Sequence, residues 1–336
     1  MMPGNKMTTK KRILSGMRPT GKLHLGHLVG ALNNWVKLQD AYDCFYMIAD
    51  WHALMSEYEN PKDIRESSYA IAKDFIASGL DPEKSVIFIQ SHVPEHLELY
   101  MVFSDLTPLG WVERCPTYKE QLREIRGRDL TTYGFLGYPV LQAADIALYK
   151  ADTVPVGVDQ IPHLELTREI VRRFNTIYGK KVFPEPEALL TKTPKLLGLD
   201  NRKMSKSYEN FIALSDEPAD ISKKVASMIT DPSRIKLEDA GHPGICNVFS
   251  YYSIFADPDT VGCVKDWCEG ASKGCTECKK SLAKILIERL EPIRLARAKL
   301  SNDDVRDILK TGAKRAGEAA GHTMAAVRSL IHFAQE

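Results

Sequence analysis

Residues 12–27 read Arg-Ile-Leu-Ser-Gly-Met-Arg-Pro-Thr-Gly-Lys-Leu-His-Leu-Gly-His. The beginning of this segment is a short apolar run of strand length, and Pro19, Thr20 and Gly21 then predict a turn. From His24 onward the apolar residues recur at helical spacing. A strand that leads through a turn into a helix is the first half of a parallel βαβ unit.

The same alternation continues along the chain. We expect further strands and helices at these residues: strands 44–49, 85–90 and 153–158, and helices 63–78 and 162–178. This order predicts an α/β fold with a Rossmann-like parallel-sheet catalytic domain and helical insertions. The pattern after residue 207 is helical, which predicts an all-helical C-terminal domain. The expected division is a disordered tail (1–11), the catalytic domain (12–206) and the helical domain (207–336).

The composition is that of a soluble globular protein. The 336 residues suffice for two domains, with 44% hydrophobic and 26% charged residues. The formal net charge is +1, so any contact with nucleic acid must come from a local basic surface. The basic, polar start has no apolar core of a signal peptide, and no run approaches the roughly 20 apolar residues of a membrane span. We therefore expect a cytoplasmic protein without a membrane contact.

The segment His24-Leu25-Gly26-His27 falls at the start of the first predicted helix. Unpaired backbone N–H groups and the helix dipole favour an anion there, and Gly26 lets a nucleotide approach the backbone. Two histidines three residues apart share a face, and either can donate to a phosphate oxygen. The alternative is that both histidines only cap and pack the helix.

The segment Lys203-Met204-Ser205-Lys206-Ser207 lies on a polar loop. Its lysines are mobile cations that could neutralise a triphosphate as pyrophosphate departs. Alone, the segment would be read as a solvated basic loop. In combination with His24-x-Gly-His27 upstream it is much more specific.

A third group of residues could bind a planar ligand. Asp145 lies in the apolar segment 138–149, where a carboxylate needs a partner, and Gln142 shares its helix face. An internal salt bridge or a cap is the conservative interpretation, whereas an indole N–H is a donor that would suit this acceptor. At the next strand–helix turn, Asp159 and Gln160 could take ribose hydroxyls and an amino group.

These motifs resemble those of class I aminoacyl-tRNA synthetases, and the wider text is similar to bacterial tryptophanyl-tRNA synthetases from Arg12 to near the C-terminus. The shared stretches are SGMRPTG (15–21), HLGH (24–27), ADWH (49–52), PTYKE (116–120), AADI (143–146), GxDQ (157–160) and KMSKS (203–207). The resemblance implies activation of L-tryptophan with ATP and Mg²⁺, transfer to tRNA(Trp), and a homodimer.

The resemblance also implies residue roles. His24, His27, Lys203 and Lys206 would be catalytic. Asp145 would accept the indole N–H, Tyr138 and Gln160 would hold the α-amino group, and His52 and Gln142 would line the pocket. ATP would be held by Arg18, Pro19, Thr20, Gly26, His27, Gly157, Val158, Asp159, Leu196, Lys203, Met204, Ser205, Lys206 and Ser207.

Five of the seven cysteines fall within residues 246–278. In a reducing compartment this crowding suggests metal ligation more than disulfides. Cys246, Cys268, Cys275 and Cys278 have the spacing C-x21-C-x6-C-x2-C, which suits zinc or an iron–sulfur cluster, whereas free buried thiols are the alternative. A subset of bacterial tryptophanyl enzymes carries a [4Fe–4S] cluster on a nearly identical pattern, and Cys263 is a possible substitute ligand.

Three other functions are compatible with part of these features. A tyrosyl-tRNA synthetase would share the fold and both signatures. A small-molecule adenylyl- or cytidylyltransferase would explain HxGH but would not need the cysteine-rich helical part. A non-catalytic RNA-binding paralogue with a metal cluster would not need intact motifs.

Overall fold

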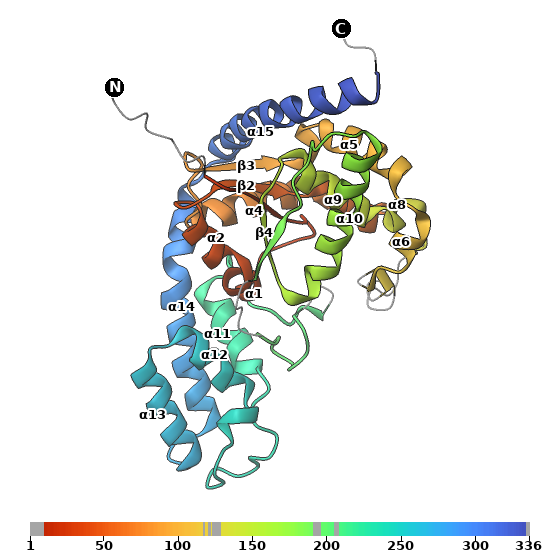
Figure 1. Cartoon of the computed structure of the whole chain (residues 1–336). Helices are drawn as coiled ribbons and strands as arrows, with labels where there is room; N and C mark the ends of the chain where they lie inside the picture. Colours follow the sequence, from red (N-terminus) through yellow and green to blue (C-terminus); the bar gives the residue numbers. More distant parts are fainter. Residues whose placement is uncertain are drawn as a thin grey trace, which may run out of the picture.

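The computed structural model describes residues 10–116, 118–119, 122, 129–190, 196–204 and 208–333. Within these residues, five parallel strands form one sheet in the order β3-β2-β1-β4-β5 (Figure 1). The strands are β1 (Arg12–Met17), β2 (Asp43–Ile48), β3 (Ser85–Ile89), β4 (Thr153–Val156) and β5 (Glu187–Leu190). The predicted α/β fold with a parallel sheet is confirmed.

Neighbouring residues of β1, β2 and β3 enter two separate hydrophobic cores, because side chains alternate across a sheet. Ile13 and Tyr46 join one core, and Leu14 and Phe45 join the other. Helices α2 (Asn33–Leu38) and α4 (Ile64–Ala77) cover the first face. The second face is covered by α5 (Glu95–Leu106), α9 (Tyr138–Leu148) and α10 (Ile161–Ile177).

Short helical segments follow the carboxyl ends of the strands. The chain enters α1 (Leu25–His27) and a π-helical segment η1 (Leu28–Leu32) after β1, α3 (Asp50–Glu57) after β2, η3 (Gln90–His92) after β3, and η4 (Val158–Gln160) after β4. The other short segments are η2 (Pro61–Asp63), α6 (Leu109–Glu113) and α8 (Tyr133–Leu136). Because ligands of open parallel sheets bind beyond the carboxyl ends of the strands, the sheet places a site at this edge.

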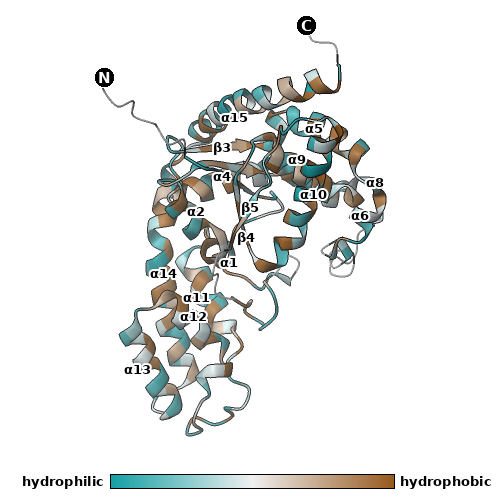
Figure 2. Cartoon of the chain, viewed as in Figure 1, coloured by the Kyte–Doolittle hydropathy of each residue, from teal (hydrophilic) through white to brown (hydrophobic). Residues whose placement is uncertain are grey.

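The C-terminal part is built from helices that lie away from the sheet and two long helices that return to it (Figure 1). The helices that lie away from the sheet are α11 (Pro218–Ser227), α12 (Asn247–Phe255) and α13 (Pro258–Glu269), and α14 (Cys275–Lys299) then runs back to pack on α4. The last, α15 (Asn302–Leu330), packs on the edge strand β3, where a Cβ at Gly312 would overlap the carbonyl oxygen of Ile87. Both apolar and polar residues occur along α13 and α15 in Figure 2, as amphipathic packing requires.

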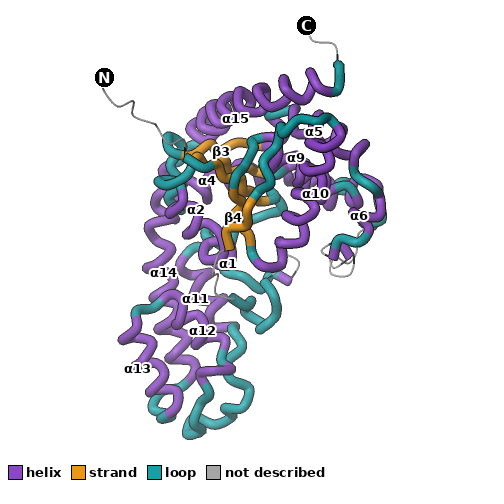
Figure 3. The backbone as a smooth tube through the Cα atoms, in the orientation of Figure 1, coloured by secondary structure: helices purple, strands orange, loops and turns teal. Residues whose placement is uncertain are grey.

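Two longer stretches depart from the helical pattern predicted after residue 207, namely residues 208–217, which contain no α-helix, and residues 228–246. Residues 228–246 form a long loop at the end of the molecule farthest from the sheet (Figure 3), with the short turn η6 (Pro243–Ile245) as its regular segment. Asp231 accepts hydrogen bonds from the backbone N–H groups of Ser233 and His242, and Asp239 accepts from Ile235 and Lys236. These side chain–backbone bonds replace helical ones, which short acidic side chains commonly do. Among the described helices, none combines the length and the apolar character that a bilayer crossing requires.

Candidate active site

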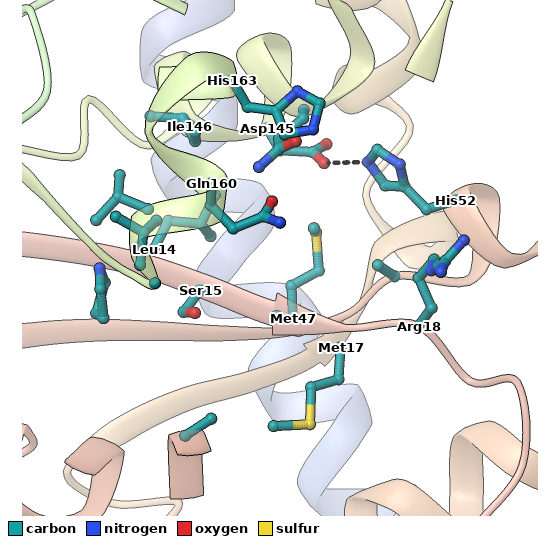
Figure 4. A pocket seen from close by; sticks show the side chains of 18 of the residues that line it. Leu14, Ser15, Met17, Arg18, Met47, His52, Asp145, Ile146, Gln160 and His163 are labelled. Atoms are coloured by element: carbon teal, nitrogen blue, oxygen red, sulfur yellow. Dashed lines mark hydrogen bonds and ion pairs between the residues drawn. The ribbon is translucent and has the colours of Figure 1, made fainter. Parts of the chain in front are cut away.

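A cavity of about 420 Å³ opens at the carboxyl ends of β1 and β4, a size typical of small-molecule sites (Figure 4). Gly16 and Met17 of β1 and Met47 of β2 form part of its wall. It brings together these predicted site residues: Arg18, His52, Tyr138, Gln142, Asp145, Gly157 and Gln160.

Asp145 is a buried carboxylate in the wall of this cavity, 2% exposed. His52 Nε2 lies 2.9 Å from Oδ2, while Gln90 Nε2 donates to Oδ1 at 2.8 Å and His96 Nδ1 lies 2.6 Å from Oδ1. Burial raises the pKa of Asp145, but the two histidines outweigh burial and leave its pKa below the usual value. Asp145 is therefore ionised, and acts only as an acceptor, at neutral pH.

The acceptor sites of Asp145 can be counted. A carboxylate offers roughly four lone-pair sites, two on each oxygen. The described residues place two nitrogens on Oδ1 and one on Oδ2. One site on Oδ2 therefore has no donor from the described part of the chain, and a ligand N–H in the cavity could supply it.

Gln90 and His96 were not predicted as site residues. Gln90 directly follows β3, so the rule that polar residues after parallel strands meet at one edge could have identified it. His96 carries no comparable signal, because it reaches Asp145 only through the packing of α5 on α9.

The hydroxyl of Tyr138 and the amide of Gln160 lie in the same cavity wall. Tyr138 is buried, and its hydroxyl lies 3.3 Å from Nε2 of His163. Gln160 Nε2 donates to Asp159 Oδ2 at 2.8 Å. Figure 4 shows His52 pointing toward Asp145 and Gln160 pointing into the cavity.

The two histidines of HLGH cap the first helical turn reciprocally. Nδ1 of His24 accepts from the N–H of Gly26, and Nδ1 of His27 accepts from the N–H of His24, both at 3.1 Å. In a neutral imidazole the proton then resides on Nε2, so each ring keeps a donor directed away from its capping bond. Both histidines therefore cap the helix, as the alternative interpretation expected. The same capping bonds favour the tautomer with a proton on Nε2, which could donate to an anion.

The KMSKS segment reaches the HLGH turn. Met204 Sδ would lie 3.1 Å from a Cβ at Gly26. Leu197 forms a bridge with Lys203, whose carbonyl accepts from Asn210 Nδ2 at 3.2 Å, so the start of the segment is anchored. Ser205, Lys206 and Ser207 lie outside the described residues.

The remaining predicted ATP residues that the structure describes do not line this cavity. Val158 is 72% exposed, Asp159 is exposed, and Leu196 packs at the margin of the first core. Pro19, Thr20, His24, Gly26, His27, Lys203 and Met204 are likewise absent from the described cavity wall. Gly21, with φ of 117°, turns the chain between β1 and the HLGH segment, a conformation that favours glycine.

The four cysteines of the predicted metal site line a second, small cavity of about 30 Å³ between the 228–246 loop, α13 and α14. Burial raises the pKa of Cys278 to about 11 and also raises that of Cys268, and the neighbouring cysteines add to both. Arg234 Nη1 lies 3.9 Å from Cys275 Sγ, whereas Cys263 is exposed and is not part of the lining. Across the described residues, no three His, Cys, Asp or Glu side chains form a group that could hold a single metal ion.

Sequence comparison assigns the chain to a family of known proteins. The sequence family described as tRNA synthetases class I (W and Y) matches residues 6–291. The chain belongs to this family of class I tRNA synthetases. A tryptophan–tRNA ligase of Thermotoga maritima is 51% identical, covering 96% of this chain and 99% of that protein, and one of Aquifex aeolicus is 43% identical over 96% and 100%.

Solved structures of tryptophanyl-tRNA synthetases also resemble this chain. The tryptophanyl-tRNA synthetase of Campylobacter jejuni complexed with ADP and tryptophan superposes with a TM-score of 0.88 at 33% identity, covering 96% of this chain and all of that one. A tyrosyl-tRNA synthetase of Archaeoglobus fulgidus has a TM-score of 0.65 at 22% identity, covering 86% of this chain and 90% of that one, and shows the fold alone. The sequence similarity is therefore to tryptophan enzymes over nearly the whole chain.

Proposed function

We propose that this chain is a tryptophan–tRNA ligase. It activates L-tryptophan with ATP to tryptophanyl-adenylate and pyrophosphate, and then transfers tryptophan to the 3′ end of tRNA(Trp). The observation that carries this proposal is the ionised Asp145 in the cavity wall, with one acceptor site that no described residue fills and that a ligand N–H could occupy. Close relatives named tryptophan–tRNA ligases support it.

In this proposal each end of the cavity binds one part of the amino acid. Asp145 accepts the indole N–H, because indole nitrogen is only a donor. Tyr138 and Gln160 hold the α-ammonium group, and His52 and Gln142 line the space between. The carboxylate of tryptophan then faces the turn after β1, where Arg18 lies.

ATP would lie between the HLGH turn and the KMSKS segment. The substrate carboxylate is the nucleophile, so the enzyme contributes alignment and charge stabilisation. His24 and His27 stabilise the transferring phosphate through Nε2–H, and Lys203 and Lys206, with Mg²⁺, stabilise the departing pyrophosphate. The other ATP contacts are Arg18, Pro19, Thr20, Gly26, Gly157 to Asp159, Leu196, Met204, Ser205 and Ser207.

Tryptophan-dependent ATP–pyrophosphate exchange tests this assignment. Asp145→Asn has one acceptor oxygen for four donors, so kcat/KM for tryptophan should fall by about 10- to 100-fold, the value of a hydrogen bond to a charged group. The matched control is Asp43→Asn outside the cavity wall, where partly exposed Asp43 pairs with Arg12, and this variant should retain exchange. Exchange driven by tyrosine would instead make the chain a tyrosyl enzyme, and no exchange in the parent would support a non-catalytic RNA-binding paralogue.

We further propose that Cys246, Cys268, Cys275 and Cys278 hold a [4Fe–4S] cluster, with zinc as the alternative. Their shared cavity supports the ligand set, and exposed Cys263 lies outside it. Four cysteine thiolates are the ligand set of [4Fe–4S] clusters, and structural zinc accepts the same set. When bound, the cluster would crosslink the 228–246 loop to α13 and α14. The role is structural or RNA-positioning, because the synthetase reaction transfers no electrons.

The metal proposal is tested by iron, sulfide and zinc analysis and an absorption spectrum of anaerobically purified protein. Equal iron and sulfide, lost in Cys278→Ser and kept in Cys263→Ser, would support the cluster. Zinc without iron would establish the alternative, and protein free of both would leave four free thiols.

We also propose two domains, a homodimer and a cytoplasmic location for this chain. The division into a catalytic domain (12–206) and a helical anticodon-binding domain (207–336) is compatible with the position of helices α11 to α13, although α14 packs on α4 and α15 packs on β3. A homodimer would cover exposed Met101, Leu109 and Tyr133 on α5, α6 and α8, which light scattering can test. We expect a cytoplasmic location, where tRNA is charged.

A further inference from the structure

His96 links Asp145 to Tyr149 behind the wall of the substrate cavity. Its Nδ1 lies 2.6 Å from Asp145 Oδ1, and its Nε2 lies 2.7 Å from the hydroxyl oxygen of Tyr149. The side chains of His96, Asp145 and Tyr149 are all buried. Asp145 belongs to the described cavity wall, whereas His96 and Tyr149 do not. A ligand in the cavity would therefore meet Asp145 and not the two residues behind it.

The direction of both hydrogen bonds follows from the ionised carboxylate. Asp145 can only accept, so Nδ1 of His96 must carry a proton, and Nε2 of the neutral ring is then an acceptor. Burial raises the pKa of Tyr149 well above its usual value, and Asp145 and Glu95 add to this effect. The Tyr149 hydroxyl therefore keeps its proton at neutral pH and can donate it to Nε2, which favours the tautomer that donates to Asp145.

The bond from His96 helps to fix one oxygen of the carboxylate. Oδ1 also accepts from Gln90 Nε2 at 2.8 Å, so its donors fill the roughly two lone-pair sites of that oxygen. The terminal torsion of an aspartate side chain is soft, and two hydrogen bonds to one oxygen restrict it. Oδ2, which lies 2.9 Å from His52 Nε2, is then the oxygen that can accept from a ligand.

We propose that His96, held in one tautomer by Tyr149, is a positioning residue that fixes Oδ1 of Asp145 and so presents Oδ2 to the indole N–H of the substrate. This rests on the proposed role of Asp145. Neither His96 nor Tyr149 touches the substrate in this proposal, so both act through the carboxylate. The competing explanation is packing, since the ring of Tyr149 stacks on Phe45 with centroids 4.8 Å apart and that of His96 stacks on Phe88 at 6.0 Å.

Two ligands separate positioning from packing. L-Tryptophan carries the indole N–H, and β-(benzo[b]thiophen-3-yl)-L-alanine has nearly the same shape with sulfur in its place. His96→Leu loses the donor to Asp145, so the dissociation constant for tryptophan should rise by about tenfold, as for one weakened hydrogen bond to a charged group. The constant for the thiophene analogue should change by less than about twofold, because this ligand gives Asp145 no donor. His96→Asn, whose amide nitrogen can donate from near the position of Nδ1, should recover part of the loss.

Asp145→Asn distinguishes the two levels of the proposal. It should reduce the preference for tryptophan over the analogue, and the double variant Asp145→Asn/His96→Leu should reduce that preference no further. If Asp145→Asn leaves the ratio of the two dissociation constants unchanged, the proposed role of Asp145 is wrong. If Asp145→Asn changes that ratio and His96→Leu does not, only the inference fails.

Tyr149→Phe provides a second approach that keeps the packed ring. It should weaken tryptophan selectively, by less than His96→Leu, because Nε2 of His96 loses its donor while the imidazole stays. The matched control is Tyr46→Phe, in which another fully buried hydroxyl, bonded to the carbonyl of Trp35, is lost, and its ratio of dissociation constants should equal that of the parent. Equal weakening of both ligands in His96→Leu and in Tyr149→Phe would make these residues packing groups and overturn the proposal.

Discussion

The folded state holds His163 neutral although an exposed histidine would titrate near pH 6.5. Burial is the main reason for its pKa of about 4, and His52 lowers that pKa further. Between about pH 6.5 and 4 the unfolded chain therefore binds a proton at this residue that the folded chain does not. The free energy of unfolding must then fall as the pH decreases through this window.

Replacing His163 should remove this contribution. In His163→Gln, the decrease in unfolding free energy between pH 7 and pH 4 should be smaller than in the parent by up to about 3 kcal/mol. Urea unfolding at several pH values measures it. His322→Gln, at an exposed position on α15, is the control and should keep the pH dependence of the parent. Parallel pH profiles for the parent and His163→Gln would contradict a buried neutral histidine.

At the scale of elements, the sequence allowed prediction wherever the signal is local. The switch from strand to helix spacing at residues 12–27 predicts β1 and α1, and the predicted bounds of β2, β3 and β4 lie within two residues of those observed. β5 (Glu187–Leu190) was missed because an edge strand of four residues, with Glu187 and Leu190 exposed, has no buried run. The loop at 228–246 was missed because its bonds join residues up to eleven positions apart, as from His242 to Asp231.

The same limit applies to the site. Asp145 and Tyr138 could be predicted because each belongs to a motif. The pairing of Asp145 with His96, 49 residues earlier, depends on the packing of two helices and leaves no local pattern. Lys206 was predicted from its motif alone, and its contacts lie outside the described residues.

The contact between α15 and β3 gives a prediction for a whole helix. Gly312 lets the backbone of α15 lie against Ile87, whereas Gly317 and Gly321 on the same helix have open space where an alanine methyl group would lie. Gly312→Ala should therefore lower the free energy of unfolding by about 1–3 kcal/mol through overpacking. Gly317→Ala and Gly321→Ala should raise it by about 0.5–1 kcal/mol, because alanine is the better helix former.

Thermal or urea unfolding of the three variants decides this point. The same substitution on the same helix should have opposite signs at the two kinds of position. Stabilisation by Gly312→Ala would show that α15 does not dock closely on β3 in solution.

At the scale of the whole molecule, arginines of α14 and α15 form hydrogen bonds and ion pairs with residues of the catalytic part. Arg297 of α14 donates to Asp74 of α4 at 2.7 Å, Arg315 of α15 donates to the carbonyl of Pro82 at 2.8 Å, and Arg328 pairs with Glu98 of α5. Asp74 is buried, and burial raises its pKa despite the opposing effect of Arg297. The Arg297–Asp74 pair therefore joins α14 to α4, a helix on the first face of the sheet.

Removing Arg297 should leave Asp74 without its cation. In Arg297→Met, the free energy of unfolding at pH 7 should fall by about 3 kcal/mol, the cost typical of breaking a buried pair. The pKa of Asp74 should rise further, so the folded chain holds a proton that the unfolded chain releases, and the loss should grow as the pH increases. Asp74→Asn in the same chain should recover part of the stability.

Arg306→Met, which breaks an exposed pair with Asp303 on α15, is the control and should change the free energy of unfolding by less than about 1 kcal/mol. A loss in Arg297→Met that is independent of pH and is not relieved by Asp74→Asn would mean that Arg297 acts through its packing and not through its charge.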